Sequence, residues 1–269
     1  MIPVPSLSLA QRTPPTAAPG AGHAAAATTS GRVVAVDLAR SMALLGMILF
    51  HGVRDLEVFG LAAPGTTLAS GWAVFARLVA GSFLFLAGVS LALAHRDGIR
   101  WRAFARRLLI VGSAAALISI VTGLIAADRF VFFGILHCIA MASVVGLVFL
   151  RAPVMAVIGA AILAFVLPDA IRGISGGNPW LLWLGPTAPV PPTLDYLPLL
   201  PWLGPFLAGL AAARLVDNVG LWPRIARWTD RGQWAWGLLA WPGRHSLSIY
   251  LLHQPVLIAV IWAVTRAMP

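Results

Sequence analysis

The sequence predicts an all-α, polytopic membrane helix bundle with about seven transmembrane helices and a cytoplasmic N-terminus. First, 59% of the 269 residues are hydrophobic and only 10% are charged, whereas soluble domains carry about 25% charged residues. Second, apolar runs of roughly 20 residues, the length that crosses a bilayer, recur along the chain. Third, all nineteen basic residues are arginine, and most lie in the short segments between those runs, as topology signals do.

The spans are predicted from the apolar runs in chain order. They cover 33–53, 68–94, 105–126, 130–150, 153–171, 197–215 and 245–265, the fifth being closed early by Pro168 and Asp169. Gly and Pro break the stretch 172–196, so an eighth span or a re-entrant segment near 175–190 stays open. Residues 1–31 lack the charged start and apolar core of a signal peptide. Their Pro, Ala, Thr and Gly content predicts a disordered cytoplasmic tail, and 32–269 then form the membrane domain.

The arginines predict the orientation of the spans. Five lie within residues 96–107 and five more within 214–244, whereas the opposite side holds Arg54, Arg129, Arg172 and Arg266. By the positive-inside rule the N-terminus and the two arginine-rich loops are cytoplasmic. With seven spans the C-terminus lies outside, and an eighth span would reverse its side.

Composition also excludes several classes of protein. The single cysteine, Cys138, lies in an apolar run, so a disulfide framework and a cysteine-based metal site are excluded. A retinal photoreceptor needs a lysine for its Schiff base, and the chain has none. The net charge of +10 follows from the topology signals, so no nucleic-acid partner is predicted.

The first span carries ionisable groups at both ends. Arg40 and His51 are eleven residues apart, which places them on one helix face and roughly 16 Å apart along the axis. Asp37 lies one turn before Arg40 and can pair with it. Asp55 lies four residues after His51, where a carboxylate can orient an imidazole if the helix continues. Because imidazole is a suitable general base near neutral pH, this face is a candidate catalytic site rather than two snorkelling side chains.

Other polar groups fall inside predicted spans: His137, His253, Gln254 and Arg77. Ionisable residues in a membrane mark functional sites by default. Histidines on three different spans predict a polar cavity through the bundle, although His137 alone would be read as a packing residue. No His-x₃-His or carboxylate spacing supports a metal site, so none is predicted.

Five segments together resemble the bacterial branch of the heparan-α-glucosaminide N-acetyltransferase family. They are RVVAVDLARSMALLGMILFHGVRDL, GSFLFLAGVSLAL, FVFFGILHCIAMAS, PWLGPFLAGLAAARL and GRHSLSIYLLHQPVLI, and they run in order from residue 32 to about 258. The Arg-x₁₀-His spacing of Arg40 and His51 is also similar to the signature of the wider transmembrane acyltransferase superfamily. In the animal lysosomal members the active histidine lies further along, but this chain has no histidine between residues 51 and 95.

The resemblance implies an enzyme of the bacterial cytoplasmic membrane, with residues 32–269 as a transmembrane acyltransferase domain. It would move an acetyl or other acyl group from cytoplasmic acyl-CoA to an amine or hydroxyl of a glycan or amino sugar outside. By motif match His51 is the general base or the covalent acyl carrier, and Asp55 orients it. Acetyl-CoA is then the donor substrate, and the donor-side arginines are Arg40, Arg77, Arg102 and Arg106. Asp37, His137, His253 and Gln254 line the polar cavity, membrane lipid is a partner, and a homodimer is left open.

Two other classes of function remain open from the sequence. Membrane histidines and arginines also mark the ion pathways of proton-coupled transporters, and the Gly/Pro-broken PLLPWLGPFLAG segment fits a discontinuous transporter helix. Two observations argue against the transporter class: the sequence shows no internal repeat, and carboxylates are scarce in the predicted spans. A non-catalytic membrane subunit is the third class.

Overall fold

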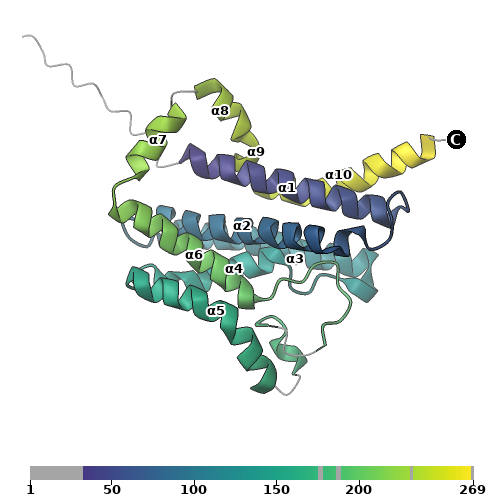
Figure 1. Ribbon diagram of the computed structural model, residues 1–269, viewed down its shortest axis with the longest axis horizontal. Coiled ribbons are helices and arrows are strands. Elements are labelled where there is room, and N and C mark those ends of the chain that lie inside the picture. Colours follow the sequence, from purple (N-terminus) through teal and green to yellow (C-terminus); the bar gives the residue numbers. More distant parts are fainter. Residues whose placement is uncertain (1–32, 175–177, 186–188, 231–232, 268–269) are drawn as a thin grey trace, which may run out of the picture. The chain divides into compact units, whose positions relative to one another are not determined.

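The computed structural model describes residues 33–174, 178–185, 189–230 and 233–267. The predicted tail, residues 1–31, lies outside these described residues. Six described helices are long and apolar enough to cross a membrane: α1 (Val34–Val58), α2 (Ser70–Ala94), α3 (Trp101–Ile125), α5 (Val154–Ile174), α6 (Leu199–Asn218) and α10 (Ser246–Ala267) (Figure 1). Each coincides with a predicted span. The all-α membrane bundle is therefore confirmed.

The fourth predicted span, 130–150, forms a shorter apolar helix, α4 (Ile135–Phe149). Its 15 residues measure only about 22 Å, less than the hydrocarbon core of about 30 Å. The helix begins late because the backbone carbonyls of the preceding segment, residues 129–134, accept hydrogen bonds from the loop before α6. Leu194 N–H donates to the Arg129 carbonyl at 2.9 Å, and Leu197 N–H to that of Phe133 at 3.0 Å. These bonds satisfy backbone groups that lipid could not.

The broken stretch before α6 contains one short 3₁₀ helix, η3 (Pro179–Leu181), among its described residues. No eighth spanning helix forms in the described part of this stretch. The loop is held by its ends: Leu199 and Leu200 N–H donate to the carbonyls of Trp183 and Leu184. Two further 3₁₀ helices, η1 (Thr66–Leu68) and η2 (Ala127–Arg129), lie in the loops after α1 and α3.

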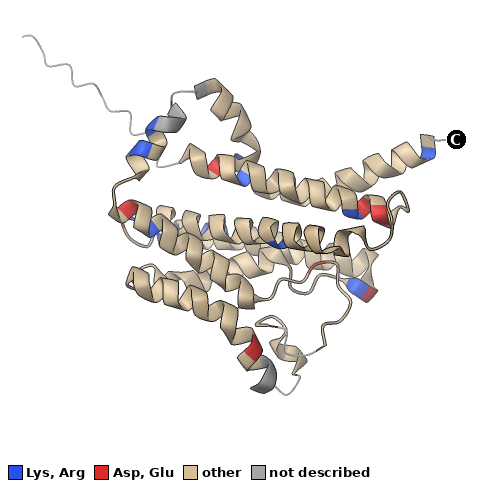
Figure 2. Cartoon of the chain, in the orientation of Figure 1, with Lys and Arg blue, Asp and Glu red and all other residues tan. Residues whose placement is uncertain are grey.

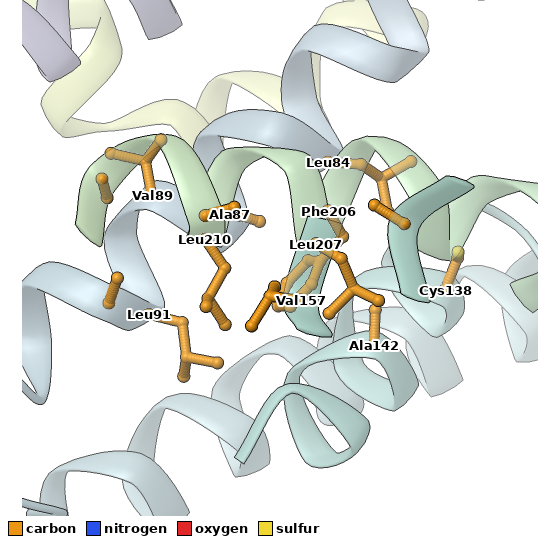
Figure 3. Packing of buried hydrophobic residues seen from close by; sticks show 14 of the residues in the cluster. Leu84, Ala87, Val89, Leu91, Cys138, Ala142, Val157, Phe206, Leu207 and Leu210 are labelled. Atoms are coloured by element: carbon orange, nitrogen blue, oxygen red, sulfur yellow. The ribbon is translucent and has the colours of Figure 1, made fainter. Parts of the chain in front are cut away.

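The core of the bundle is built where α2 crosses α6. A Cβ atom on Gly88 would overlap the Phe206 carbonyl oxygen, and one on Gly209 would overlap that of Phe85. Small residues at such crossings let two membrane helices approach closely. Around the crossing, Leu84, Leu91, Phe206, Leu207 and Leu210 are buried together with residues of α4 and α5 (Figure 3).

The first span packs against the last. Helix α1 contacts α2 on one side and α9 (Trp241–Arg244) and α10 on another. Gly243 of α9 sits so close to α1 that a Cβ would overlap the Asp37 carbonyl oxygen, and its N–H donates to Ser41 Oγ at 2.9 Å. The amphipathic α7 (Trp222–Asp230) and α8 (Gln233–Leu239) connect α6 to α9. The C-terminal helices α9 and α10 thus pack against the first helix, α1.

The surfaces of the spans suit lipid. Large apolar side chains point outward, for example Leu124, which is 81% exposed, and Ile162 and Val166 of α5. Charged residues gather toward the ends of the helices and leave long uncharged segments between (Figure 2). This pattern, apolar outside as well as inside, is that of a bundle surrounded by hydrocarbon.

Candidate active site

Four polar side chains meet between α1 and α10, and we call them the histidine cluster: His51, Asp55, His253 and Gln254. The His51 and His253 rings lie edge to face with centroids 4.9 Å apart. Gln254 Nε2 donates to Asp55 Oδ1 at 2.7 Å, and the Asp55 side chain is buried. Helix α1 continues to Val58, so Asp55 does lie one turn beyond His51 on the same helix.

The hydrogen bonds define the protonation of one imidazole. His253 Nδ1 lies 2.5 Å from the Tyr250 carbonyl oxygen, and because a carbonyl can only accept, Nδ1 carries the hydrogen. In the neutral ring, His253 Nε2 therefore has a lone pair. It is buried, and it has no hydrogen-bond partner among the described residues.

Two more buried atoms of the cluster share this condition. Asp55 Oδ2 and Gln254 Oε1 have no hydrogen-bond partner in the described part of the chain. An unsatisfied buried polar atom costs about 1–3 kcal/mol, so native structures keep few of them. Three such atoms at one place make the histidine cluster the candidate polar site of the described residues.

The carboxylate does not make the contact that the spacing predicted. Within the described residues, Asp55 accepts a hydrogen bond from Gln254 and none from His51. The far end of α1 is held separately. Arg54 donates to Thr67 Oγ1 at 3.0 Å, and Glu57 accepts from the backbone and hydroxyl of Thr67. These hydrogen bonds hold the loop after α1 against the end of that helix, next to Asp55.

The other end of α1 carries an arginine cluster, defined here as Arg40 and Arg244, which contact Asp37, together with Arg107 near Arg40. Arg40 donates to Asp37 Oδ1 at 3.0 Å and to the Ser90 hydroxyl of α2. Arg244 Nε lies 3.8 Å from Asp37 Oδ2. Arg107 of α3 is half-buried and is repelled by the like charge of Arg40. Arg40 and Arg244 thus contact one buried carboxylate, so the positive charges at this place exceed the negative one.

Within the arginine-rich residues 96–107, the sequence analysis singled out two neighbours of Arg107 rather than Arg107 itself. The predicted donor-side residues Arg102 and Arg106 are exposed on α3. A signal was present: Phe104, Arg107, Leu108 and Val111 follow the i, i+3, i+4, i+7 spacing of one helix face and line the same small internal cavity. An arginine within an apolar stripe is the one that points inward.

Two other predicted residues lie apart from both clusters. His137 belongs to the contact between α3 and α4, where its Nδ1 accepts from Gly134 N–H and its Nε2 lies 3.3 Å from Ser119 Oγ. Arg77 is exposed on α2 and lines a groove with α6. Ser90, which contacts Arg40, lies thirteen residues further along α2, roughly 20 Å away at 1.5 Å per residue.

A carboxylate that was not predicted completes the start of α4. Asp195 Oδ2 accepts a hydrogen bond from Ile135 N–H at 2.9 Å, a helix N-terminus being favourable for negative charge. Burial nevertheless raises the pKa of Asp195 to about 6, against the opposing effect of that hydrogen bond. No group of three or more His, Cys, Asp or Glu side chains arranged to hold a metal ion occurs among the described residues.

Comparison with known proteins matches most of the chain to one protein family. The family model described as heparan-alpha-glucosaminide N-acetyltransferase, catalytic, matches residues 32–255. The matched range begins just before α1 and ends at Pro255, so it includes both clusters. No curated protein and no solved structure matches the chain significantly.

Proposed function

Because the chain belongs to the heparan-alpha-glucosaminide N-acetyltransferase family of membrane acetyltransferases, we propose that it moves an acetyl or other acyl group across the membrane. The donor is cytoplasmic acyl-CoA, and the acceptor is an amine or hydroxyl of a glycan or amino sugar on the opposite side. The chain works in a bacterial cytoplasmic membrane. The observation that carries the proposal is the His51–His253 contact with its unpaired buried polar atoms.

Acyl transfer to a sugar needs one group to take a proton. The acceptor nitrogen or oxygen attacks the thioester carbonyl carbon, the carbon–sulfur bond breaks, and the acceptor proton passes through a base to the leaving thiolate. An unprotonated imidazole nitrogen beside the carbonyl can perform this step. His253 Nε2 is such an atom, and His51 is its immediate neighbour.

For His51 we propose two alternative roles: it shares the proton transfer with His253, or it is a covalent carrier, in which the acyl group passes first to a ring nitrogen and then to the acceptor. In either route an imidazolium forms transiently. Asp55, whose carboxylate is fixed by Gln254, would stabilise that positive charge as a buried aspartate does beside a catalytic histidine. Trapping of labelled acyl-enzyme after a single turnover separates the two routes.

The arginine cluster is the proposed donor end. Guanidinium groups bind phosphates through paired, planar hydrogen bonds, and coenzyme A carries several phosphates. Arg40 and His51 are eleven residues apart on one face of α1, roughly 16 Å, a distance that the pantetheine arm can span when extended. The exposed Arg102 and Arg106 of α3 add positive charge on the proposed donor side of the membrane and attract the donor from solution.

Purified protein in proteoliposomes tests the proposal. Acetyl-CoA supplied on the side of the arginine cluster should release free coenzyme A, and glucosamine on the other side should accelerate the release and become acetylated. The buried Cys138 keeps the thiol background low. A preparation that is monodisperse but releases no coenzyme A, with or without amino sugars, would contradict an acyltransferase function.

A further inference from the structure

A groove of about 730 Å³ runs along α2 and α6 and is used by neither cluster. Its walls are apolar and include Leu78, Phe85, Phe165 of α5, Trp202 and Pro205. Ser82 also lines it, but its hydroxyl donates to the Val79 carbonyl. Arg77 is the one cation in the lining. Its side chain has no hydrogen bond or ion pair with any residue that the structure describes.

The depth of Arg77 in the predicted membrane follows from helix geometry. Arg77 is the eighth residue of α2, about 10 Å from the first residue at 1.5 Å per residue. The 25 residues of α2 extend about 37 Å, so each end projects about 4 Å beyond a hydrocarbon core of about 30 Å. The Arg77 backbone then lies about 6 Å inside that core, and its long side chain reaches the head-group layer.

Most of the groove lining on α2 lies deeper than Arg77, and only Val74 lies nearer the start of the helix. Gly81 and Phe85 follow on α2, four and eight residues further along, which carries the apolar lining about 12 Å toward the bilayer centre. A cation at the level of the head groups above an apolar trough is complementary to an anionic amphiphile. An isolated arginine at this depth is otherwise unfavourable in a lipid-facing position.

We propose that this groove binds one membrane lipid with an anionic phosphate head group. The Arg77 guanidinium contacts the phosphate oxygens, for which its planar fork is suited, and one acyl chain lies against Leu78, Phe85 and Trp202. The groove has the volume of a small-molecule site. The proposal does not depend on acyl transfer, because Arg77 is about 20 Å along α2 from the arginine cluster.

Native mass spectrometry of the full chain tests the site, with phosphatidylglycerol as the anionic probe and phosphatidylcholine as the zwitterionic one. Arg77→Gln should weaken phosphatidylglycerol binding at least about fivefold, the effect of one arginine at a charged membrane surface. Arg266→Gln is the matched control, since it removes the same charge from the predicted same side and should leave binding unchanged.

A second pair of variants tests the apolar part of the groove. A Cβ on Gly81 would come no closer than 4.0 Å to Pro205 and Trp202, so Gly81→Ala should retain lipid, whereas the larger Gly81→Leu should fill the groove and displace it. Monodispersity by size exclusion verifies the fold of each variant. Parental phosphatidylglycerol binding in both Arg77→Gln and Gly81→Leu, or equal binding of phosphatidylcholine, would overturn the proposal.

Discussion

The imidazole of His51 on the first spanning helix lies edge to face against that of His253 on the last, with ring centroids 4.9 Å apart. We expect the two imidazoles to act as a unit in the proposed acyl transfer rather than as independent residues. His51→Ala and His253→Ala should each lower the rate of acyl transfer by about 10²- to 10⁴-fold, the usual effect of losing a general base. The double variant should be little worse than the weaker single variant, because groups acting together are not additive.

Matched histidine variants make that result specific. His245 is exposed, so His245→Ala should keep the parental rate. Asp55→Asn should lose less activity than His51→Ala, because the asparagine carbonyl still accepts the Gln254 hydrogen bond. Parental turnover in both His51→Ala and His253→Ala, measured as coenzyme A release by monodisperse protein, would remove the catalytic role from this cluster.

Arg40 should not tolerate lysine if it holds the donor. Arg40→Lys keeps the charge but loses the forked contacts to Asp37 and Ser90. We expect the KM for acetyl-CoA to rise by about tenfold or more, which is the effect of losing hydrogen bonds to charged groups. The control variant Arg129→Lys should keep the parental KM. A KM equal to that of the parent would mean that Arg40 only places a charge at the membrane surface.

The orientation of the bundle can be measured with single cysteines. Asp97 is exposed in the arginine-rich loop between α2 and α3, and Ala63 is exposed in the loop after α1. An impermeant maleimide applied to intact cells should label Ala63→Cys and leave Asp97→Cys unlabelled. The native Cys138 is fully buried and adds little background. The reverse pattern would place the arginine cluster on the outer side.

The α2–α6 crossing should be intolerant of a methyl group. Gly88→Ala would drive a Cβ into the Phe206 carbonyl, and overpacking of this kind costs about 1–3 kcal/mol. The melting temperature in detergent, at one scan rate, should fall clearly. Gly112→Ala in α3 is the control, since a Cβ there meets nothing within 4 Å. Equal melting temperatures for the two variants would refute this close packing.

Asp195 should make stability depend on pH in an unusual direction. Its pKa is raised from 3.8 to about 6 in the folded protein, so the folded state holds the proton more tightly than the unfolded state. Its contribution to stability is fully present below pH 3.8 and is lost as the pH rises through about 6. In the Asp195→Asn variant, the melting temperature should therefore depend less on pH over this range. An unchanged pH profile in this variant would assign the dependence to other groups.

The positions of the spans could be predicted because lipid requires continuous apolar runs, and Arg40, His51 and Asp55 could be placed on one face from helix geometry alone. The pairing of Arg40 with Asp37, one turn away on the same helix, was predicted as well, but the partners on other helices could not be. Asp55 bonds to a residue 199 positions away, and nothing in the periodicity of α1 or α10 specifies that these two helices pack together. The start of α4 at Ile135 depends likewise on Asp195, sixty residues distant.

The histidine cluster joins the first and last spans, and this has a consequence for biogenesis. Translation proceeds at about 5–20 residues per second, so Asp55 is synthesised roughly 10–40 s before Gln254, which lies 199 positions further along. During that interval the carboxylate has no amide partner, and the two imidazoles are not yet in contact. The cluster is therefore assembled only when insertion of α10 is complete, and a ribosome that stalls before α10 leaves a chain without it.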